Sequence, residues 1–163
     1  FSISVNFSRI TIHHRSFYTD FHTIIEKYKI PSHCIEIEIT ESAFNELSST
    51  IIKMLINLKN EGFNILIDDF GSGYSSLNLL NTLELDEIKI DRIFLNPENA
   101  KREQIIGLIV DIAEALNMKV ICEGIETKED IEMLDKLNCK RGQGFYFSKP
   151  IPCNEFIKKF KQS

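Results

Sequence analysis

The sequence predicts an α/β protein in which parallel β-strands alternate with crossover helices. Short apolar runs of strand length and longer stretches with apolar residues at helical spacing follow one another along all 163 residues. No stretch rich in proline, glycine or serine interrupts this alternation, which indicates a single domain. Periodicity alone leaves two architectures open, an open doubly wound sheet and a (β/α) barrel.

Six short apolar runs have the length and composition of strands. In chain order they are residues 3–7, 35–39, 64–68, 85–90, 120–123 and 144–147. The helices expected between them are residues 17–28, 51–58, 102–116 and 127–137, with a short helical turn at 75–80 and a last helix at 152–160. Thr127 and the acidic residues that follow it are typical of a capped helix start.

Composition and charge narrow the function classes. The chain is 43% hydrophobic and 26% charged, which is typical of one globular domain with a core. Its net charge of −5 provides no electrostatic footprint for duplex nucleic acid. No run approaches the roughly 20 apolar residues of a membrane span, so we expect no direct membrane insertion. The four cysteines form no CxxC pair and no signal peptide is recognisable, which favours reduced thiols and a cytoplasmic location.

Polar side chains recur on one face of five predicted strands. Because side chains alternate between the two faces of a strand, each of these residues lies opposite the aliphatic row of its own strand, near the carboxyl end. They are Asn6, Glu38, Asp68, Lys89 and Glu123. Carboxylates gathered at one point repel unless cations lie between them, and oxygen ligands suit Mg²⁺, Mn²⁺ or Ca²⁺. The shared placement predicts a divalent metal site, whereas each residue alone is typical of a salt-bridged or surface group.

Two adjacent carboxylates, Asp68 and Asp69, end the apolar run 64–67. Two acids at the end of a core strand are unfavourable unless a cation meets them. Gly71 and Gly73 make the next loop flexible. This loop lacks the lysine of a P-loop and the third glycine of a dinucleotide fingerprint, so we interpret it as a hinge beside the acids.

These residues lie in segments that resemble the EAL domain of bacterial cyclic di-GMP phosphodiesterases. The resemblance covers nearly the whole chain, and the six segments occur in the family's order. They are Val5-Asn6-Phe7-Ser8, Glu38-Ile39-Thr40-Glu41, Asp68-Asp69-Phe70-Gly71-Ser72-Gly73-Tyr74-Ser75-Ser76, Lys89-Ile90-Asp91, Glu123-Gly124-Ile125-Glu126 and Gly142-Gln143-Gly144-Phe145. The third segment is specific for the family by itself.

The resemblance implies a (β/α) TIM-type barrel of the EAL kind with one antiparallel strand, of which about six of the eight strands are present. It implies hydrolysis of cyclic di-GMP to linear pGpG with Mg²⁺ or Mn²⁺ in a two-metal site, and inhibition by Ca²⁺. It also implies a homodimer as one assembly and sensory or GGDEF-type domains elsewhere in the parent chain. The parent is then cytoplasmic, or this domain is the cytosolic part of a membrane-bound multidomain protein.

The resemblance also assigns roles to single residues. It implies metal ligation by Asn6, Glu38, Asp68, Asp69 and Glu123, with Asp68 bridging two metals and Asp69 supporting the second. Lys89 resembles the lysine that contacts the nucleophilic water or the phosphate, and Glu123 resembles the general base. Glu41 is similar to the glutamate that positions the loop 71–76, where Gly71, Ser72 and Gly73 are expected to meet the substrate. The residues that complete the polar shell are Glu126, Gln143 and Asp91.

One part of the family pattern is missing, because nothing here matches the Glu-Ala-Leu segment or its nearby arginine. A barrel of this type usually needs roughly 250 residues, and Phe1 opens directly into a strand without a preceding methionine. We therefore expect residues 1–163 to be a single EAL-type domain that lacks its N-terminal strands, with activity in the intact domain and impaired activity in this piece. The alternatives are a non-catalytic cyclic di-GMP receptor or protein-interaction domain, and a barrel aldolase or isomerase with Lys89 as its Schiff base.

Overall fold

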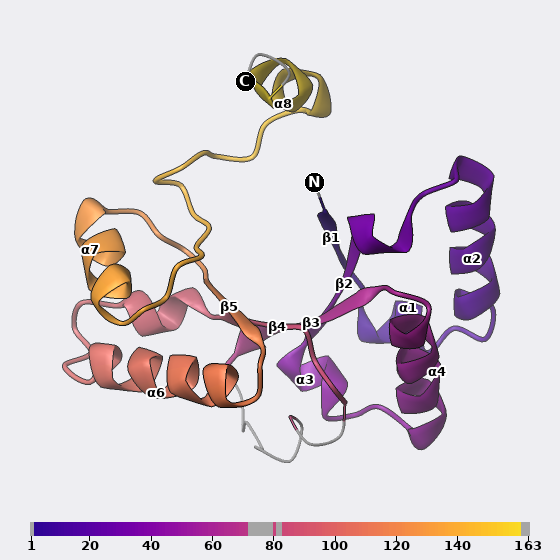
Figure 1. The fold of residues 1–163 in the computed structure, drawn as a ribbon, viewed down its shortest axis with the longest axis horizontal. Coiled ribbons are helices and arrows are strands. Elements are labelled where there is room, and N and C mark those ends of the chain that lie inside the picture. Colours follow the sequence, from indigo (N-terminus) through magenta and orange to yellow (C-terminus); the bar gives the residue numbers. More distant parts are fainter. Residues whose placement is uncertain (1, 72–79, 81–82, 161–163) are drawn as a thin grey trace.

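The computed structural model describes residues 2–71, 80 and 83–160, and its centre is a curved sheet of parallel strands (Figure 1). The strands are β1 (Ile3–Asn6), β2 (Ile35–Thr40), β3 (Asn64–Phe70), β4 (Glu87–Ile90) and β5 (Lys119–Cys122). Their order in the sheet is β1-β2-β3-β4-β5. A doubly wound sheet reverses its order at a switch point, whereas a barrel wall adds strands in one direction. The order therefore favours the barrel over the doubly wound sheet.

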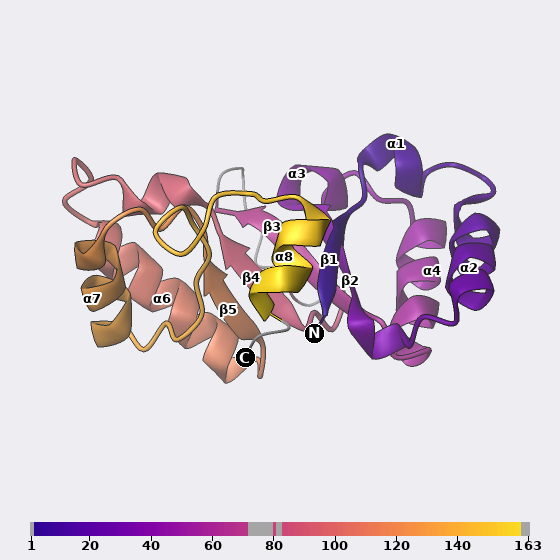
Figure 2. The ribbon, with the colours of Figure 1, turned by 90° about the horizontal axis from the view of Figure 1, so that it is seen from above.

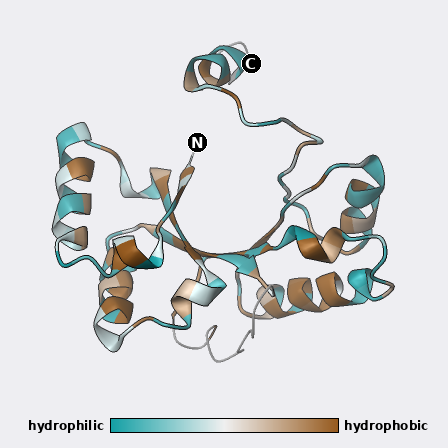
Figure 3. Cartoon of the chain, turned by 180° about the vertical axis from the view of Figure 1, so that it is seen from behind, coloured by the Kyte–Doolittle hydropathy of each residue, from teal (hydrophilic) through white to brown (hydrophobic). Residues whose placement is uncertain are grey.

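Helices cover the convex face of this sheet. Figures 1 and 3 show α2 (Phe17–Tyr28) and α4 (Ser49–Asn60) outside one half of the wall, and α6 (Arg102–Ala115) and α7 (Lys128–Lys136) outside the other half. The short helices α1 (Arg9–Ile12) and α3 (Glu41–Phe44) and the 3-10 turns Ser32–Cys34 and Arg92–Leu95 were not predicted. Figure 2 shows α8 (Cys153–Phe160) in front of the strands, at the end of an extended segment.

The core lies between the convex face and the helices. Six of the isoleucines predicted to share one face of the strands are inaccessible to solvent, and they are Ile37, Ile39, Ile65, Ile67, Ile88 and Ile90. Ile35 is half-buried, and Ile3 on the edge strand β1 is exposed. In Figure 3, hydrophobic residues run along the strands and along α6, which packs on β4 and β5. Burial of these side chains, at about 25 cal/mol per Å² of apolar surface, is the main stabilising contribution to the fold. The opposite, concave face is left for the polar residues.

Residues 144–147, predicted as a sixth strand, form a turn instead. The N–H of Tyr146 donates to the carbonyl of Ile125, and the turn closes from Ser148 to Gly144. A Cβ at Gly144 would lie 2.1 Å from the carbonyl oxygen of Ile125, so the two backbones meet closely here. Pairing with β5 instead occurs earlier in the chain, through a single parallel bridge between Cys122 and Gly142.

Other predictions have mixed outcomes. The capped start at Thr127 is confirmed, because its hydroxyl accepts from the Asp130 N–H while the Asp130 carboxylate accepts from the Thr127 N–H. The helical turn predicted at 75–80 lies, apart from Leu80, outside the described residues. The antiparallel strand is not among the strands of the described residues, whose pairings are all parallel.

All four cysteines are free thiols. In the described part of the chain, no helix has the length and hydropathy needed to span a membrane.

Candidate metal and catalytic site

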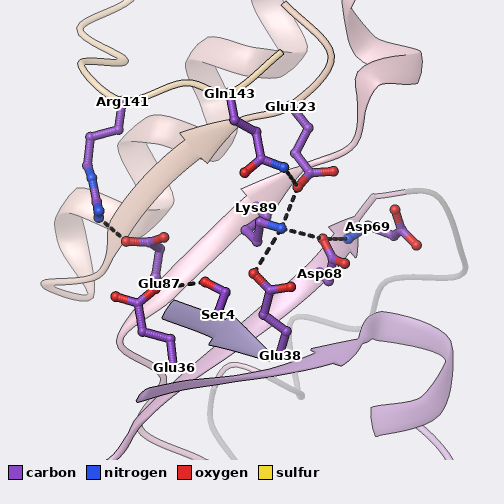
Figure 4. Close-up of polar contacts among 10 residues, drawn as sticks. All are labelled: Ser4, Glu36, Glu38, Asp68, Asp69, Glu87, Lys89, Glu123, Arg141 and Gln143. Atoms are coloured by element: carbon purple, nitrogen blue, oxygen red, sulfur yellow. Dashed lines mark hydrogen bonds and ion pairs between the residues drawn. The ribbon is translucent and has the colours of Figure 1, made fainter. Parts of the chain in front are cut away.

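The centre of the site is the ammonium group of Lys89 on β4, which carboxylates from β2, β3 and the loop after β5 surround. Its Nζ lies 3.0 Å from Oε1 of Glu38 on β2 and 3.3 Å from Oδ1 of Asp68 on β3. It lies 2.5 Å from Oε1 of Glu123, which follows β5. The Lys89 side chain is only 6% exposed. Figure 4 shows these side chains meeting on the concave face, so the predicted convergence of Glu38, Asp68, Lys89 and Glu123 is what the fold produces.

Strand register explains this convergence. Thr40 of β2 pairs with Asp68 of β3, which places Glu38 two residues before that position on the same face. Between β4 and β5, Lys89 pairs with Ile121, so Glu123 lies two residues beyond that position on the same face. Asn6 is the register partner of Glu38 and therefore lies beside it at the edge of the sheet, in an exposed position. Simple alternation in parallel strands is thus sufficient to bring these residues together.

Asp69 reaches the site because β3 is irregular at this position. Neighbouring residues on a regular strand point to opposite faces, which would turn Asp69 away from Asp68. The register between β3 and β4 shifts between Ile67 and Phe70, and Asp69 takes the left-handed conformation with φ of 55°. Irregularities of this kind re-aim side chains next to active sites. As a result, one carboxylate oxygen from each of Asp68, Asp69 and Glu123 lies within 4.8 Å of the others.

Gln143 holds the outer side of Glu123. Its amide Nε2 donates to Glu123 Oε1 at 2.5 Å, the same oxygen that Lys89 contacts (Figure 4). The backbone of Glu123 is fixed separately, because its N–H donates to the carbonyl of Ile90 at 3.0 Å. Glu123 is therefore restrained at its main chain and at one carboxylate oxygen.

The turn after β3 is fixed by Glu41, the first residue of α3. The Glu41 side chain is buried, and its Oε2 accepts a hydrogen bond of 2.8 Å from the backbone N–H of Gly71. Gly71 has φ of 90°, and a Cβ there would lie 2.6 Å from the ring of Phe94. Glycine is therefore required here on two grounds, backbone conformation and space. Ser72 and Gly73, predicted to meet the substrate, lie outside the described residues.

Burial and mutual repulsion alter the acid–base properties of the site. Burial raises the pKa of Asp69, and the neighbouring Asp68 adds to this effect. Burial also raises the pKa of Glu123, although the hydrogen bond from Lys89 opposes it. Burial works against the Lys89 charge, but hydrogen bonds to Glu123 and Glu38 outweigh it and raise the pKa of Lys89. Lys89 therefore stays charged at neutral pH.

The remaining predicted residues lie around this centre. Asp91 caps the 3-10 turn that follows β4, because its Oδ1 accepts from the N–H of Ile93 at 2.9 Å. Its charge also acts on Asp69. Glu126 is exposed and, together with Glu123 and Gln143, lines a cavity of about 510 Å³ between the rim of the sheet and α8. This cavity gives a ligand access to the outer side of Glu123.

A second ion pair on the concave face was not predicted. Glu87, two residues before Lys89 on β4, is 3% exposed, and its Oε2 is paired with the guanidinium of Arg141. Burial raises the pKa of Glu87, and Arg141 opposes that shift. Glu87 could have been predicted, because it lies two residues before Lys89 and therefore on the same face of the strand. No pattern in the sequence pointed to Arg141, because its contact depends on how the chain returns to the sheet after α7.

The donor set fits divalent cations. Carboxylates from Glu38, Asp68 and Glu123 contact the ammonium group of Lys89, and the Asp69 carboxylate lies beside those of Asp68 and Glu123. This leaves an excess of negative charge in a poorly solvated place, which is unfavourable without further cations. Carboxylate oxygens are the donors preferred by Mg²⁺ and Mn²⁺.

Comparison with known proteins shows which family the chain resembles. The family model described as "EAL domain" matches residues 1–150. The chain is 36% identical over 157 residues to the oxygen sensor protein DosP of Escherichia coli (strain K12), covering 94% of this chain and 20% of that protein. It is 35% identical over 159 residues to the bifunctional diguanylate cyclase/cyclic di-GMP phosphodiesterase MucR of Pseudomonas aeruginosa, covering 96% of this chain and 23% of that protein. The chain thus spans about a fifth of the length of these relatives.

Solved structures match along nearly the same length. The PaMucR phosphodiesterase in complex with c-di-GMP has a TM-score of 0.89 at 32% identity and covers 96% of this chain and 70% of that one. The manganese/cy-diGMP complex of Klebsiella pneumoniae BlrP1 has a TM-score of 0.83 at 28% identity and covers 91% of this chain and 39% of that one. Sequence motifs, barrel-type strand order and these matches lead to one conclusion: the chain belongs to the EAL domain family.

Proposed function

We propose that this domain hydrolyses cyclic di-GMP to linear pGpG in a reaction that depends on divalent metal ions. The observation that carries the proposal is the convergence of Glu38, Asp68 and Glu123 on one buried point around Lys89. The relatives support it, because two of them are named cyclic di-GMP phosphodiesterase NbdA and probable cyclic di-GMP phosphodiesterase PdeG. Two matching structures are complexes with c-di-GMP.

We assign Mg²⁺ or Mn²⁺ to the carboxylate cluster. The residues that would hold the ions are Asn6, Glu38, Asp68, Asp69 and Glu123. Asp68 is the candidate bridging ligand, because it lies in the acidic group with Asp69 and Glu123 and also contacts Lys89 beside Glu38. Two divalent ions supply charge stabilisation for in-line displacement at phosphorus and make a water molecule acidic near neutral pH.

The remaining roles in the reaction are assigned to Lys89, Glu123 and Gln143. Lys89, held charged by its carboxylate partners, stabilises negative charge on the phosphate or orients the attacking water. Glu123 accepts the proton of that water, and its raised pKa brings it closer to the neutral range, where a general base is most effective. Gln143 keeps the carboxylate of Glu123 in position through Oε1.

The substrate is expected to meet the rim of the site. Glu41 fixes the start of the loop through Gly71, and the loop residues Gly71, Ser72 and Gly73 are proposed to contact the substrate. Glu126 lines the cavity beside Glu123, and Asp91 supports the turn behind Asp69. Both residues also have a local structural role, because the Glu126 N–H donates to the Asp130 carboxylate and the Asp91 carboxylate accepts from the Ile93 N–H.

The direct test is to incubate the full-length protein that carries this sequence with cyclic di-GMP and to separate the products by chromatography. We expect linear pGpG with Mn²⁺ or Mg²⁺, no product with a chelator, and less product when Ca²⁺ is added. Tight binding of cyclic di-GMP without any linear product, in the presence of Mn²⁺, would identify a receptor and overturn the proposed activity. Formation of a borohydride-trapped adduct at Lys89 would instead support the aldolase alternative.

The other domains of the parent chain, its oligomeric state and its cellular location stay predictions. The names of two relatives, an oxygen sensor protein and a bifunctional diguanylate cyclase/cyclic di-GMP phosphodiesterase, support sensory or GGDEF-type domains in the parent chain. A homodimer and a cytoplasmic location are likewise proposed. Light scattering of the full-length protein and fractionation of the cells that produce it test these two points.

A further inference from the structure

The Arg141–Glu87 ion pair connects two parts of the chain that are far apart in sequence. Glu87 lies on β4 in the layer of the concave face below Lys89, and its side chain is 4% exposed. Arg141 follows α7 and is half exposed, with 45% of its side chain accessible. Figure 4 shows its guanidinium reaching across β5 to the carboxylate of Glu87. The pair thus links the segment that follows α7 to the concave face of the sheet at β4.

Gln143 is two residues further along the same segment. The carbonyl of Arg141 accepts from the N–H of Cys122, and the N–H of Gln143 donates to the carbonyl of Cys122. Residues 141–143 therefore pair with β5 as a short strand would, and alternation directs the side chains of Arg141 and Gln143 to one face. In Figure 4, Arg141 contacts the lower layer at Glu87, while Gln143 contacts Glu123 at the rim.

Segment 141–143 is attached to β5 through its backbone, and a hydrogen bond from the Ile125 N–H to the Gln143 carbonyl continues this pairing. It forms one parallel bridge with β5, at Gly142, and Gly144 follows immediately. Register is weakly specified in short strands that contain glycine and lack an alternating apolar pattern. A slip by one residue would turn Gln143 away from Glu123. Buried polar groups specify register in some proteins, and the Arg141–Glu87 pair, whose carboxylate is buried, adds a side-chain restraint to this backbone pairing.

We propose that Arg141 is a positioning residue for the metal site: its ion pair with Glu87 fixes segment 141–143 on β5 so that Gln143 restrains Oε1 of Glu123. This inference rests on the proposed function to the extent that Glu123 takes part in metal binding. Arg141 acts through Gln143, and its own guanidinium pairs with Glu87. The position of the Glu123 carboxylate then depends on an ion pair at the start of β4.

A double-mutant cycle tests this coupling with Mn²⁺ binding, measured by calorimetry on the full-length protein, as the readout. Outer partners of metal ligands typically contribute about 10-fold to metal affinity. We therefore expect Arg141→Gln and Gln143→Ala each to weaken Mn²⁺ binding about 10-fold. Because both changes act through one contact, the double variant is expected to be about 10-fold weaker as well, instead of about 100-fold.

The matched control is Lys140→Gln, one residue upstream. Lys140 carries the same charge and contacts Asp135 Oδ1 at 3.0 Å, but both side chains are more than half exposed. Its replacement is expected to leave the Mn²⁺ affinity within about 2-fold, since exposed pairs contribute little. If Arg141→Gln does not fold, the double variant Glu87→Gln/Arg141→Gln removes both partners of the pair, a change that proteins tolerate better, and is expected to show the same 10-fold loss.

Two results would overturn the inference. One is an Mn²⁺ affinity of Arg141→Gln within about 2-fold of the unaltered protein, and the other is multiplication of the two single effects in the double variant. The proposed activity fails in a different way, through Mn²⁺ binding by the unaltered protein without hydrolysis of cyclic di-GMP. The two failures are therefore distinguishable.

Discussion

Lys89 Nζ lies 2.5 Å from Oε1 of Glu123, and this ion pair closes a ring of carboxylates that begins on β2. The lysine provides the positive charge that the described carboxylates share, at the point where divalent ions are proposed to bind. Lys89 and the metals therefore compete for the same oxygens. This competition makes stability, metal affinity and activity depend on one another in ways that can be measured.

Asp68→Asn tests the proposed bridging ligand. The amide keeps the size of the side chain but removes its charge, so it is a poor ligand for two divalent ions at once. We expect kcat for cyclic di-GMP hydrolysis by the full-length protein to fall at least about 100-fold. Asp135→Asn, on the exposed side of α7, is the matched control and should leave kcat unchanged. Near-normal turnover by Asp68→Asn would contradict the role given to Asp68.

Lys89→Met tests the competition between the lysine and the metals. Removing one partner of a buried ion-pair network leaves uncompensated charge, so the free energy of unfolding without metal should fall by about 3–5 kcal/mol. Added Mn²⁺ should raise the melting temperature of this variant more than that of the unaltered protein, because the metal replaces the lost ammonium.

The control for this experiment is Lys59→Met, which breaks the 2.6 Å contact with Asp86 outside the site. Its loss of stability should not be recovered by Mn²⁺. Equal recovery in the two variants would show that the metal does not act at the carboxylates around Lys89.

Gly71→Ala tests the turn that Glu41 holds. The added Cβ meets the ring of Phe94, and φ of 90° is unfavourable for alanine, so we expect a loss of about 1–3 kcal/mol in unfolding free energy. Gly107→Ala in α6 is the opposite case, because its Cβ would make an ordinary contact of 3.6 Å with Leu137. That variant should be more stable by up to about 1 kcal/mol, since alanine favours a helix. Chemical denaturation of both variants measures the difference, and equal effects would contradict the geometry of the turn.

The pH dependence of stability tests the burial of Glu87. Burial raises the pKa of Glu87 in the folded protein, so the folded state holds this proton more tightly than the unfolded chain. The free energy of unfolding therefore decreases as pH rises from the ordinary glutamate pKa, about 4.3, through the raised pKa of Glu87. Glu87→Gln cannot titrate and lacks this decrease. Measured from about pH 4 to pH 7 by denaturant titration, the variant should gain stability relative to the unaltered protein, and the opposite trend would contradict the assignment.

Much of the site could be predicted because strand alternation needs only the sequence. The rows of isoleucines set the buried face, and the face opposite them then contained Glu38, Asp68, Lys89 and Glu123. The order of strands could not be obtained in this way, since periodicity carries no information on which strands pair. The observed order β1 to β5 separates the barrel from the doubly wound sheet, in agreement with the barrel that the family resemblance implies.

The parts that could not be predicted depend on breaks in regular structure. Asp69 joins Asp68 through a register shift and a left-handed residue, which alternation does not include. The apolar residues 144–147 have strand propensity, yet the close approach of Gly144 to Ile125 places them in a turn. Pairing with β5 instead involves Arg141, Gly142 and Gln143, which carry no strand signal. Tertiary contact overrides propensity at this point.

Anomalous diffraction at the manganese edge, from crystals of the full-length protein grown with Mn²⁺, is the most direct measurement. We expect peaks within coordination distance of the carboxylate oxygens of Asp68, Asp69 and Glu123, with Lys89 moved away from at least one of its present partners. Absence of manganese from this cluster, with Lys89 still bound to Glu38, Asp68 and Glu123, would mean that the carboxylates form a structural ion-pair network and would contradict metal-dependent catalysis.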